Sequence, residues 1–275
     1  MTRIALFQSN TGIDPAANSL ALKKAIGEAA AGGAEMLFTP EMSGLLDRDS
    51  SRAAKNLRAE EEDLVLAACR EAAKQHRIWL HIGSLAVLAD SGKLANRGFV
   101  IDREGNIRAR YDKLHLFDVD LPTGESWRES NVYSPGSGVV LVNGTPVGKL
   151  GLTICYDLRF PGLFARLAEA DADLIAVPAA FTVPTGKAHW HVLLRARAIE
   201  AGLFVVAAAQ VGRHADGRTT FGHSLVIDPW GDVLLDMGDE PGVAFAEIDL
   251  SRISDVRSRI PALSHRRPIP EAVTL

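Results

Sequence analysis

Short apolar segments alternate with helix-forming segments along this chain, and the alternation limits the folds open to it. Residues 4–7, 36–39 and 173–177 form apolar runs of strand length. Residues 60–76 instead place apolar side chains at helical spacing, and Asp14-Pro15 marks the start of an earlier helix. This alternation predicts a single α/β domain over residues 1–275, with one mixed sheet or two stacked sheets.

Hairpins and loops interrupt that alternation. Residues 98–111 are predicted to form one hairpin, and residues 139–154 another, whose turn is predicted at Asn143-Gly144. A further turn is predicted at Asp90-Ser91-Gly92. Residues 117–138 have little periodicity, and a loop of that length inside a compact domain is usually functional, so we expect it to cover a site.

Composition and charge exclude several functional classes. Lys and Arg number 30 and Asp and Glu 34, which gives a net charge of −4 and a pI of about 6.1. The chain therefore lacks the basic surface typical of proteins that bind nucleic acid or anionic membranes. No apolar run has the length of a membrane span, and we expect no signal peptide. Two cysteines cannot form a disulfide framework, so we expect a reducing, cytoplasmic setting.

Cofactor and metal motifs are not found. Residues 144–149 are one position short of a phosphate loop, and residues 136–138 lack the third glycine of a dinucleotide site. His189 and His191 stand two apart at a predicted helix start and point to different sides, so we expect no zinc site there. We accordingly predict no cofactor.

The two cysteines have different surroundings. Cys69 shares an apolar helix face and is predicted to pack in the core, which is the usual place for a lone cysteine. Cys155 ends a buried apolar run and is followed at once by polar residues and a helix, an arrangement that mounts a nucleophile at the end of a strand. Spacing alone leaves open a dyad of Cys155 with His115, His189 or His223.

Reactive groups follow three predicted strands. Glu41, Lys113 and Cys155 each come just after the end of a predicted strand, in that order along the chain. In open α/β sheets, sites form at the carboxyl ends of strands. A carboxylate can accept a thiol proton, an ammonium can lower the thiol pKa and stabilise an oxyanion, and sulfur can form an acyl intermediate. The three groups together supply what amide hydrolysis requires.

The segments around these residues resemble the nitrilase superfamily of carbon–nitrogen hydrolases. The resemblance covers almost the whole chain and places the Glu–Lys–Cys set of that family on Glu41 in TPEM, Lys113 in YDKLHLFD and Cys155 in GLTICYDLRFP. A second glutamate of the family, which braces the site, matches Glu129 in RESNVYSPG. The resemblance implies a four-layer α-β-β-α sandwich of the nitrilase type, with subunits commonly paired into a homodimer or higher homo-oligomer.

Other segments narrow the expected substrate. Four segments are similar to the superfamily's amidases of deaminated glutathione: residues 185–200, 207–214, 221–231 and 264–268. The resemblance implies hydrolysis of a small terminal carboxamide to acid and ammonia through a Cys155 thioester. An ω-amidase acting on α-ketoglutaramate, an N-carbamoyl amidase and an aliphatic amidase remain open within the class. A non-catalytic binding protein or a redox sensor is the alternative outside it.

Two further positions are expected to take part in that reaction. The backbone N–H of Tyr156 is expected to help Lys113 hold the oxyanion, and Arg159 either binds a substrate carboxylate or pairs with a neighbouring acid. Residues 181–188 are expected to be a loop that lines the pocket and sets specificity. The partner is then a small amide, with neither nucleic acid nor membrane involved.

Overall fold

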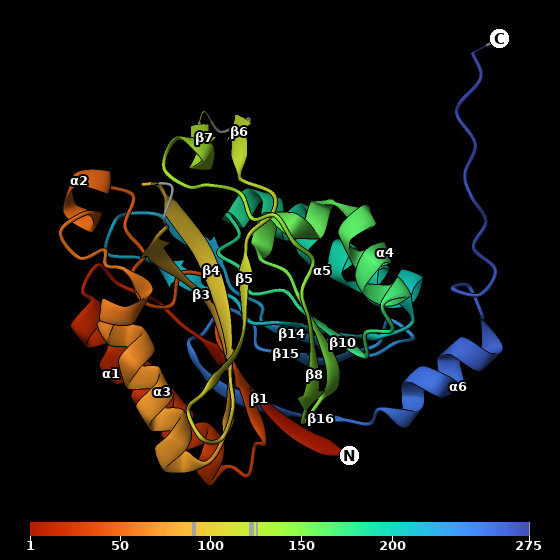
Figure 1. Ribbon diagram of the computed structural model, residues 1–275, viewed down its shortest axis with the longest axis horizontal. Coiled ribbons are helices and arrows are strands. Elements are labelled where there is room, and N and C mark those ends of the chain that lie inside the picture. Colours follow the sequence, from red (N-terminus) through yellow and green to blue (C-terminus); the bar gives the residue numbers. More distant parts are fainter. Residues whose placement is uncertain (90–91, 121–123, 125, 275) are drawn as a thin grey trace.

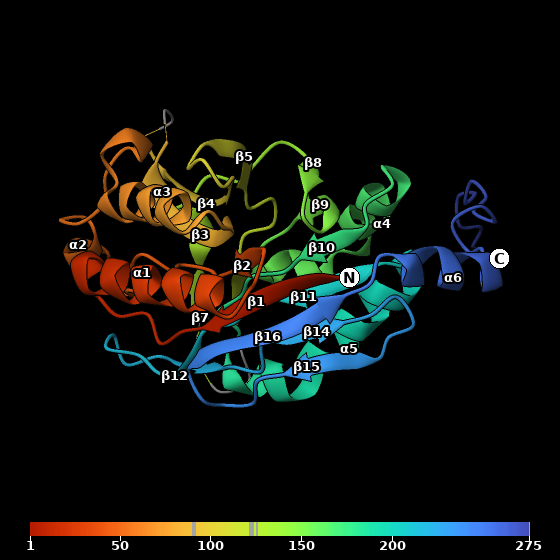
Figure 2. The ribbon, with the colours of Figure 1, turned by 90° about the horizontal axis from the view of Figure 1, so that it is seen from below.

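Two six-stranded sheets lie face to face in the computed structural model of the protein, which describes residues 1–89, 92–120, 124 and 126–274 (Figures 1 and 2). The first sheet has the order β16-β1-β2-β3-β4-β5. Its strands are β1 (Thr2–Gln8), β2 (Met36–Phe38), β3 (Trp79–Leu88), β4 (Leu94–Ile101), β5 (Ile107–Asp112) and β16 (Gly242–Ile248). The second has the order β15-β14-β11-β10-β9-β8. Its strands are β8 (Leu141–Thr145), β9 (Gly148–Leu152), β10 (Leu174–Ala176), β11 (Phe204–Ala207), β14 (Leu225–Ile227) and β15 (Val233–Asp236).

Helices cover the outer face of each sheet. In Figure 1, α1 and α3 lie together outside the first sheet, and α4 and α5 outside the second. The helices are α1 (Pro15–Ala31), α2 (Ser50–Ala53), α3 (Leu64–His76), α4 (Pro161–Glu169), α5 (Val183–Ala201) and α6 (Ser251–Arg259). Short 3-10 turns occur at η1 (Glu60–Glu62), η2 (Glu129–Asn131) and η3 (Cys155–Arg159). The four-layer α-β-β-α prediction is confirmed.

The alternation of side chains along each strand builds two cores. In β1, Ile4 and Leu6 face the second sheet and join the large core that also contains α4 and α5. Ala5, between them, faces the other way and packs with α1 and α3. Cys69 lies in this second core and is fully buried, as predicted. Burial raises the pKa of its thiol to about 12, which leaves it unreactive.

The helix starts follow local capping. Asp14 accepts a hydrogen bond from the N–H of Ala16, and Pro15 opens α1 as predicted. The predicted helix over residues 60–76 is shorter than expected because Asp63 caps α3 by accepting from the N–H of Leu66 at 2.7 Å. The three glutamates before it form the separate turn η1.

Two predicted loops contain regular structure. In residues 117–138, β6 (Asp118–Asp120) pairs with β7 (Ser126–Arg128), so the prediction of a loop without structure is wrong. Strands this short and polar have no periodicity to reveal them. The loop predicted at 181–188 is also wrong, because α5 begins at Val183 with Pro184 in its first turn.

Two turns complete the comparison with the sequence. The turn predicted at Asn143-Gly144 is displaced: β8 continues through both residues with an irregular register, and the chain reverses at Pro146 and Val147. Pro146 favours a turn because its ring fixes φ and it has no N–H to donate. The turn predicted at Asp90-Ser91-Gly92 falls on positions 90–91, outside the described residues. A small hairpin of β12 (Val211–Arg213) and β13 (Thr219–Phe221) lies beyond the second sheet.

Candidate active site

The three predicted strand ends meet at one end of the two facing sheets, where β2, β5 and β9 finish. Glu41 follows β2 and Lys113 follows β5, both in the first sheet, whereas Cys155 follows β9 in the second. All three side chains are buried. The structure brings all three side chains to one place, and Glu41 and Cys155 come from opposite sheets.

Lys113 is the centre of a buried network of ion pairs. Its Nζ donates to Oε1 of Glu41 at 2.9 Å and to both carboxylate oxygens of Glu129, at 3.1 and 2.9 Å. The Lys113 side chain is 2% exposed. Glu129 also accepts from the N–H of Phe117 at 2.7 Å, which anchors the β6–β7 segment to the site. One ammonium therefore lies between two carboxylates.

Asn96 completes this network and was not predicted from the sequence. Its Nδ2 donates to Glu41 at 3.0 Å and to Glu129 at 3.1 Å, so it joins the two carboxylates on a second side. Asn96 lies within the buried strand β4 and is 1% exposed. A polar side chain inside an apolar strand needs a partner, and that is the signal that could have identified it.

Cys155 sits on a sharp turn between β9 and η3. Its φ is +49°, which is uncommon for a residue with a side chain, and its N–H donates to the carbonyl of Pro178 at 2.8 Å. The charge of the Glu41 carboxylate acts on its thiol and raises the thiol pKa. Oε2 of Glu41 accepts from the N–H of Ala180 at 3.0 Å. The backbone thus fixes both the nucleophile and the base.

The electrostatics keep Glu41 ionised and Cys155 protonated. Burial by itself would raise the pKa of Glu41, but the charge of Lys113 and the hydrogen bonds from Lys113, Cys155 and Asn96 outweigh it and lower that pKa. For Cys155, burial and the Glu41 charge raise the pKa well above the ordinary 9.0 despite the opposing charge of Lys113. A thiol therefore faces an ionised carboxylate.

Lys113 lowers the pKa of the thiol, as expected, but burial and the charge of Glu41 raise that pKa by more. Burial would lower the pKa of Lys113, but Glu129 and Glu41 raise it well above 10.5, so the ammonium persists. Its charge is already balanced by the two carboxylates and cannot outweigh the burial of Cys155. Cys155 therefore rests as a thiol, with no preformed thiolate.

Asp157 holds the turn after the nucleophile in place. Its carboxylate accepts from Tyr111 Oη at 2.7 Å, from the N–H of Ile154 at 2.9 Å and from the N–H of His115 at 3.0 Å. His115 Nδ1 also contacts it at 2.7 Å. His115 therefore serves to order the turn, which argues against a dyad with Cys155.

The other two histidines considered for such a dyad also have different partners. His189 lies 3.2 Å from Arg159, and His223 lies 2.9 Å from Asp236. Neither one, nor His115, lines the cavity into which Cys155 opens. The structure favours Glu41 as the base.

A cavity of about 410 Å³ opens onto Cys155. It is bordered by Glu41, Lys113, Glu129, Cys155, Tyr156, Arg159, Phe181 and, from the β6–β7 segment, Phe117, Ser126, Trp127 and Arg128. The prediction that residues 117–138 cover a site is confirmed. Tyr156 follows Cys155 in the first turn of η3, where backbone N–H groups lack partners within the helix.

Arg159 presents a positive charge to this cavity. Its guanidinium contacts His189 Nδ1 at 3.2 Å and lies 5.7 Å from the centre of the Phe181 ring. Within the described part of the chain, no carboxylate forms an ion pair with it. The alternative of a neighbouring acidic partner is therefore not supported, and the side chain stays available to a ligand.

Comparisons with known proteins agree with this geometry. The family model for carbon–nitrogen hydrolases matches residues 3–258. The deaminated glutathione amidase of Yersinia enterocolitica is 38% identical over 88% of this chain and 85% of its own length. The crystal structure of the Caenorhabditis elegans NitFhit protein is 39% identical, with a TM-score of 0.89 over 97% of this chain and 65% of that longer one.

A solved amidase also bears on the cysteine. A variant of the amidase from Nesterenkonia sp. AN1, 27% identical with a TM-score of 0.81, covers 97% of this chain and 94% of that one. Its active-site cysteine carries the acetamide moiety of fluoroacetamide as a covalent adduct. The family match over nearly the whole length, together with the buried Glu–Lys–Cys arrangement, leads to one conclusion. This chain belongs to the carbon–nitrogen hydrolase family.

Proposed function

We propose that the protein is a thiol-dependent amidase that hydrolyses a small terminal carboxamide to the acid and ammonia. The observation that carries this proposal is the burial of Cys155, Glu41 and Lys113 at one cavity, where the Lys113 ammonium donates to Glu41 at 2.9 Å. A base, a nucleophile and a fixed positive charge are the three requirements of acyl transfer from an amide.

Acylation begins with Glu41 accepting the thiol proton as Cys155 Sγ attacks the amide carbon. The positive charge of Lys113 and the N–H of Tyr156 stabilise the oxyanion of the tetrahedral intermediate. Glu41 then gives its proton to the leaving nitrogen, the C–N bond breaks and ammonia departs. A thioester on Cys155 remains.

Deacylation repeats these steps with water. Glu41 takes a proton from the water, whose oxygen attacks the thioester carbon, and the same donors hold the second oxyanion. The proton returns to Cys155 Sγ as the C–S bond breaks, so the acid leaves and the enzyme is restored. Glu129 and Asn96 touch no reacting atom and serve to position Lys113 and Glu41.

We propose an acidic amide as the substrate class, because Arg159 offers a guanidinium to the cavity without a carboxylate partner among the described residues. Relatives named deaminated glutathione amidase make that metabolite the first candidate. An ω-amidase substrate such as α-ketoglutaramate also carries an acid and remains the alternative. Neutral aliphatic amides would leave Arg159 unused.

The test is ammonia release from deaminated glutathione, α-ketoglutaramate and an N-carbamoyl amino acid, by wild type and Cys155→Ala. We expect the highest kcat/KM for the first, no release by the variant, and a thioester adduct on Cys155 by mass spectrometry in rapidly quenched wild type. Preference for another of these amides would change the substrate assignment and leave the proposed mechanism intact. Release by Cys155→Ala equal to wild type would refute the mechanism.

The redox-sensing alternative is less well supported. A sensor thiol is exposed and has a low pKa, and it often has a resolving cysteine beside it. Cys155 has a raised pKa, and Cys69 is a buried residue of α3 in the other core. A non-catalytic binding role does not explain why Glu41, Lys113 and Cys155 are buried together at one cavity.

We further propose that the protein forms a homodimer and works in the cytoplasm. Val192 and Ile199 are exposed apolar residues of α5, and the segment after α6 extends away from the body of the subunit (Figure 1), as would suit contact with a second copy. A reducing compartment would keep Cys155 free. No helix among the described residues has the length and apolar character needed to cross a membrane. Sedimentation equilibrium tests the dimer, which a single monomer mass would refute.

A further inference from the structure

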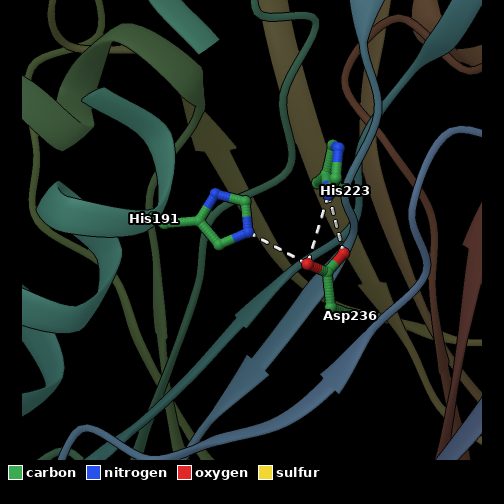
Figure 3. Close-up of side chains that lie close together, drawn as sticks. All are labelled: His191, His223 and Asp236. Carbon is green, nitrogen blue, oxygen red and sulfur yellow. Dashed lines mark hydrogen bonds and ion pairs between the residues drawn. The ribbon is translucent and has the colours of Figure 1, made fainter. Parts of the chain in front are cut away.

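Three metal-ligating side chains meet outside the catalytic cavity. His191 comes from α5, His223 from the connection between β13 and β14, and Asp236 from the end of β15 (Figure 3). None of the three lines the cavity next to Cys155. Among the described residues, they are the one group of three or more His, Cys, Asp or Glu side chains close enough to share an ion.

Their ligand atoms already have separations close to those of a metal centre. His191 Nε2 lies 3.0 Å from Asp236 Oδ2, His223 Nδ1 lies 2.9 Å from Oδ1, and no two ligand atoms are more than 4.8 Å apart. Bonds of 2.0–2.1 Å to a tetrahedral zinc ion separate neighbouring ligand atoms by about 3.3–3.4 Å. Small side-chain rotations would therefore bring all three atoms to one ion.

The backbone holds His223 in this position. Its N–H donates to the carbonyl of Gly238 at 2.7 Å, and its own carbonyl accepts from Trp190 Nε1 at 2.8 Å. Its φ is +54°, an uncommon value for a residue with a side chain, and Phe221 stacks on its ring at 4.5 Å. Such fixation lowers the entropy lost when an ion binds.

The neighbouring contacts also position His191 and Asp236. Gly186 lets the first turns of α5 approach Phe221, since a Cβ there would lie 2.2 Å from that ring. Asp236 is fixed by the N–H of Gly238, which donates to Oδ1 at 2.9 Å.

We propose that His191, His223 and Asp236 bind a divalent late first-row metal ion of the zinc class. Imidazole nitrogens suit zinc, copper and nickel, and two histidines with one carboxylate leave further coordination positions for water. On binding, the ion takes the place of the two N–H···O hydrogen bonds. Each neutral ring keeps one proton, on the nitrogen that faces away from the ion.

The position of the site makes it structural. It joins α5 to β15 and to the start of β14, so an ion there cross-links the outer helix layer to the second sheet. The side chains of His191, His223 and Asp236 are 36%, 28% and 35% exposed, which lets an ion enter from solvent. Amide hydrolysis by Cys155 needs no contribution from this ion, and the two proposals can fail independently.

Direct binding to the full chain tests this inference. The Cys155→Ala protein, from which the catalytic thiol has been removed as a competing ligand, is stripped with chelator and titrated with Zn²⁺ by calorimetry. Co²⁺ titration reports the geometry through its visible absorption. We expect one equivalent to bind, with cobalt bands of low coordination number, and we expect zinc to raise the Tm.

Two variants in that background identify the ligands. His191→Ala is expected to weaken zinc binding at least tenfold, on the order of the loss seen when metal sites are perturbed. Asp236→Asn, which keeps the shape of the side chain, is expected to do the same if folding is unchanged by circular dichroism. His76→Ala removes an exposed histidine of α3 and should bind zinc as the parent does. No saturation at millimolar zinc, or equal binding by parent and His191→Ala, would show a hydrogen-bonded cluster only and overturn the proposal.

Discussion

Nζ of Lys113 lies 2.9 Å from Oε2 of Glu129, and this buried pair lets a positive charge persist beside the catalytic carboxylate. A lone ammonium at 2% exposure would lose its proton, because burial disfavours the charged form. With Glu129 on one side and Glu41 on the other, the pKa of Lys113 lies well above 10.5 and the ammonium persists. Glu129 thus acts through Lys113 and belongs to the site as a positioning residue.

Glu129→Gln should lower kcat and leave KM nearly unchanged. The amide keeps the shape of the side chain but removes one of the two charges that hold Lys113, so the oxyanion donor loses its position. We expect a loss of about 10- to 100-fold, smaller than the 10²–10³ typical of deleting such a donor. Glu60→Gln is the matched control, because Glu60 pairs with Arg97 and Arg110 away from the cavity. Steady-state kinetics that give equal kcat values for the two variants would contradict the role of Glu129.

Glu41→Gln should make Cys155 more acidic while nearly abolishing turnover. The carboxylate charge raises the pKa of Cys155 and Lys113 lowers it, so removing the carboxylate charge moves that pKa downward from its value above 9.0. Loss of the base should cost about 10²–10⁴ in kcat. The rate of iodoacetamide labelling against pH measures the thiol. The labelling rate of wild type should reach no plateau below pH 9.0. A labelling midpoint for Glu41→Gln at the same pH as wild type, or at a higher pH, would contradict the electrostatic effect of Glu41.

Arg159→Ala should raise KM selectively for amides that carry a carboxylate. A hydrogen-bonded charge pair contributes about 1.5–3 kcal/mol, so we expect a rise of about 10- to 100-fold for the acidic substrate and little change for a neutral amide. Arg166→Ala, which removes an exposed arginine paired with Glu169, is the control. Kinetics with one acidic and one neutral amide decide the question, and equal KM changes for both would argue for a structural role.

His81 should make the protein sensitive to acid. It is buried in β3, no partner for its Nδ1 occurs among the described residues, and burial lowers its pKa from 6.5 to about 3. Between pH 6.5 and about pH 3, the unfolded chain binds a proton at His81 and the folded protein does not. The contribution of neutral His81 to the free energy of unfolding is therefore fully present above pH 6.5 and is lost as the pH falls. The slope is up to about 1.4 kcal/mol per pH unit.

His81→Leu should remove that slope. Denaturant unfolding of wild type and variant at several pH values between 4 and 6.5 gives the free energies of unfolding. His76→Leu, at an exposed position of α3, should retain the wild-type slope. The assignment would fail if the His81 variant kept the full slope.

The sequence could predict that Glu41, Lys113 and Cys155 share a site because each follows a predicted strand, and strand ends converge in an α/β fold. Asn96 was missed because a polar residue inside a buried strand gives no local sign of its partners. The loop expected at residues 181–188 misses the start of α5, whose first turn contains Pro184, a residue favoured at that position of a helix. His191, His223 and Asp236 come from separate elements, so only tertiary packing brings them together.

The origin of Glu41 and Cys155 in opposite sheets has one further consequence. Their relative position depends on how the two sheets align across the shared core, so the catalytic rate is sensitive to that alignment. A misplacement of about 1 Å can cost 10²-fold in rate. A core substitution that shifts one sheet along the other would therefore abolish activity while leaving the Tm nearly unchanged. Activity measurements would then detect changes in packing that thermal unfolding does not.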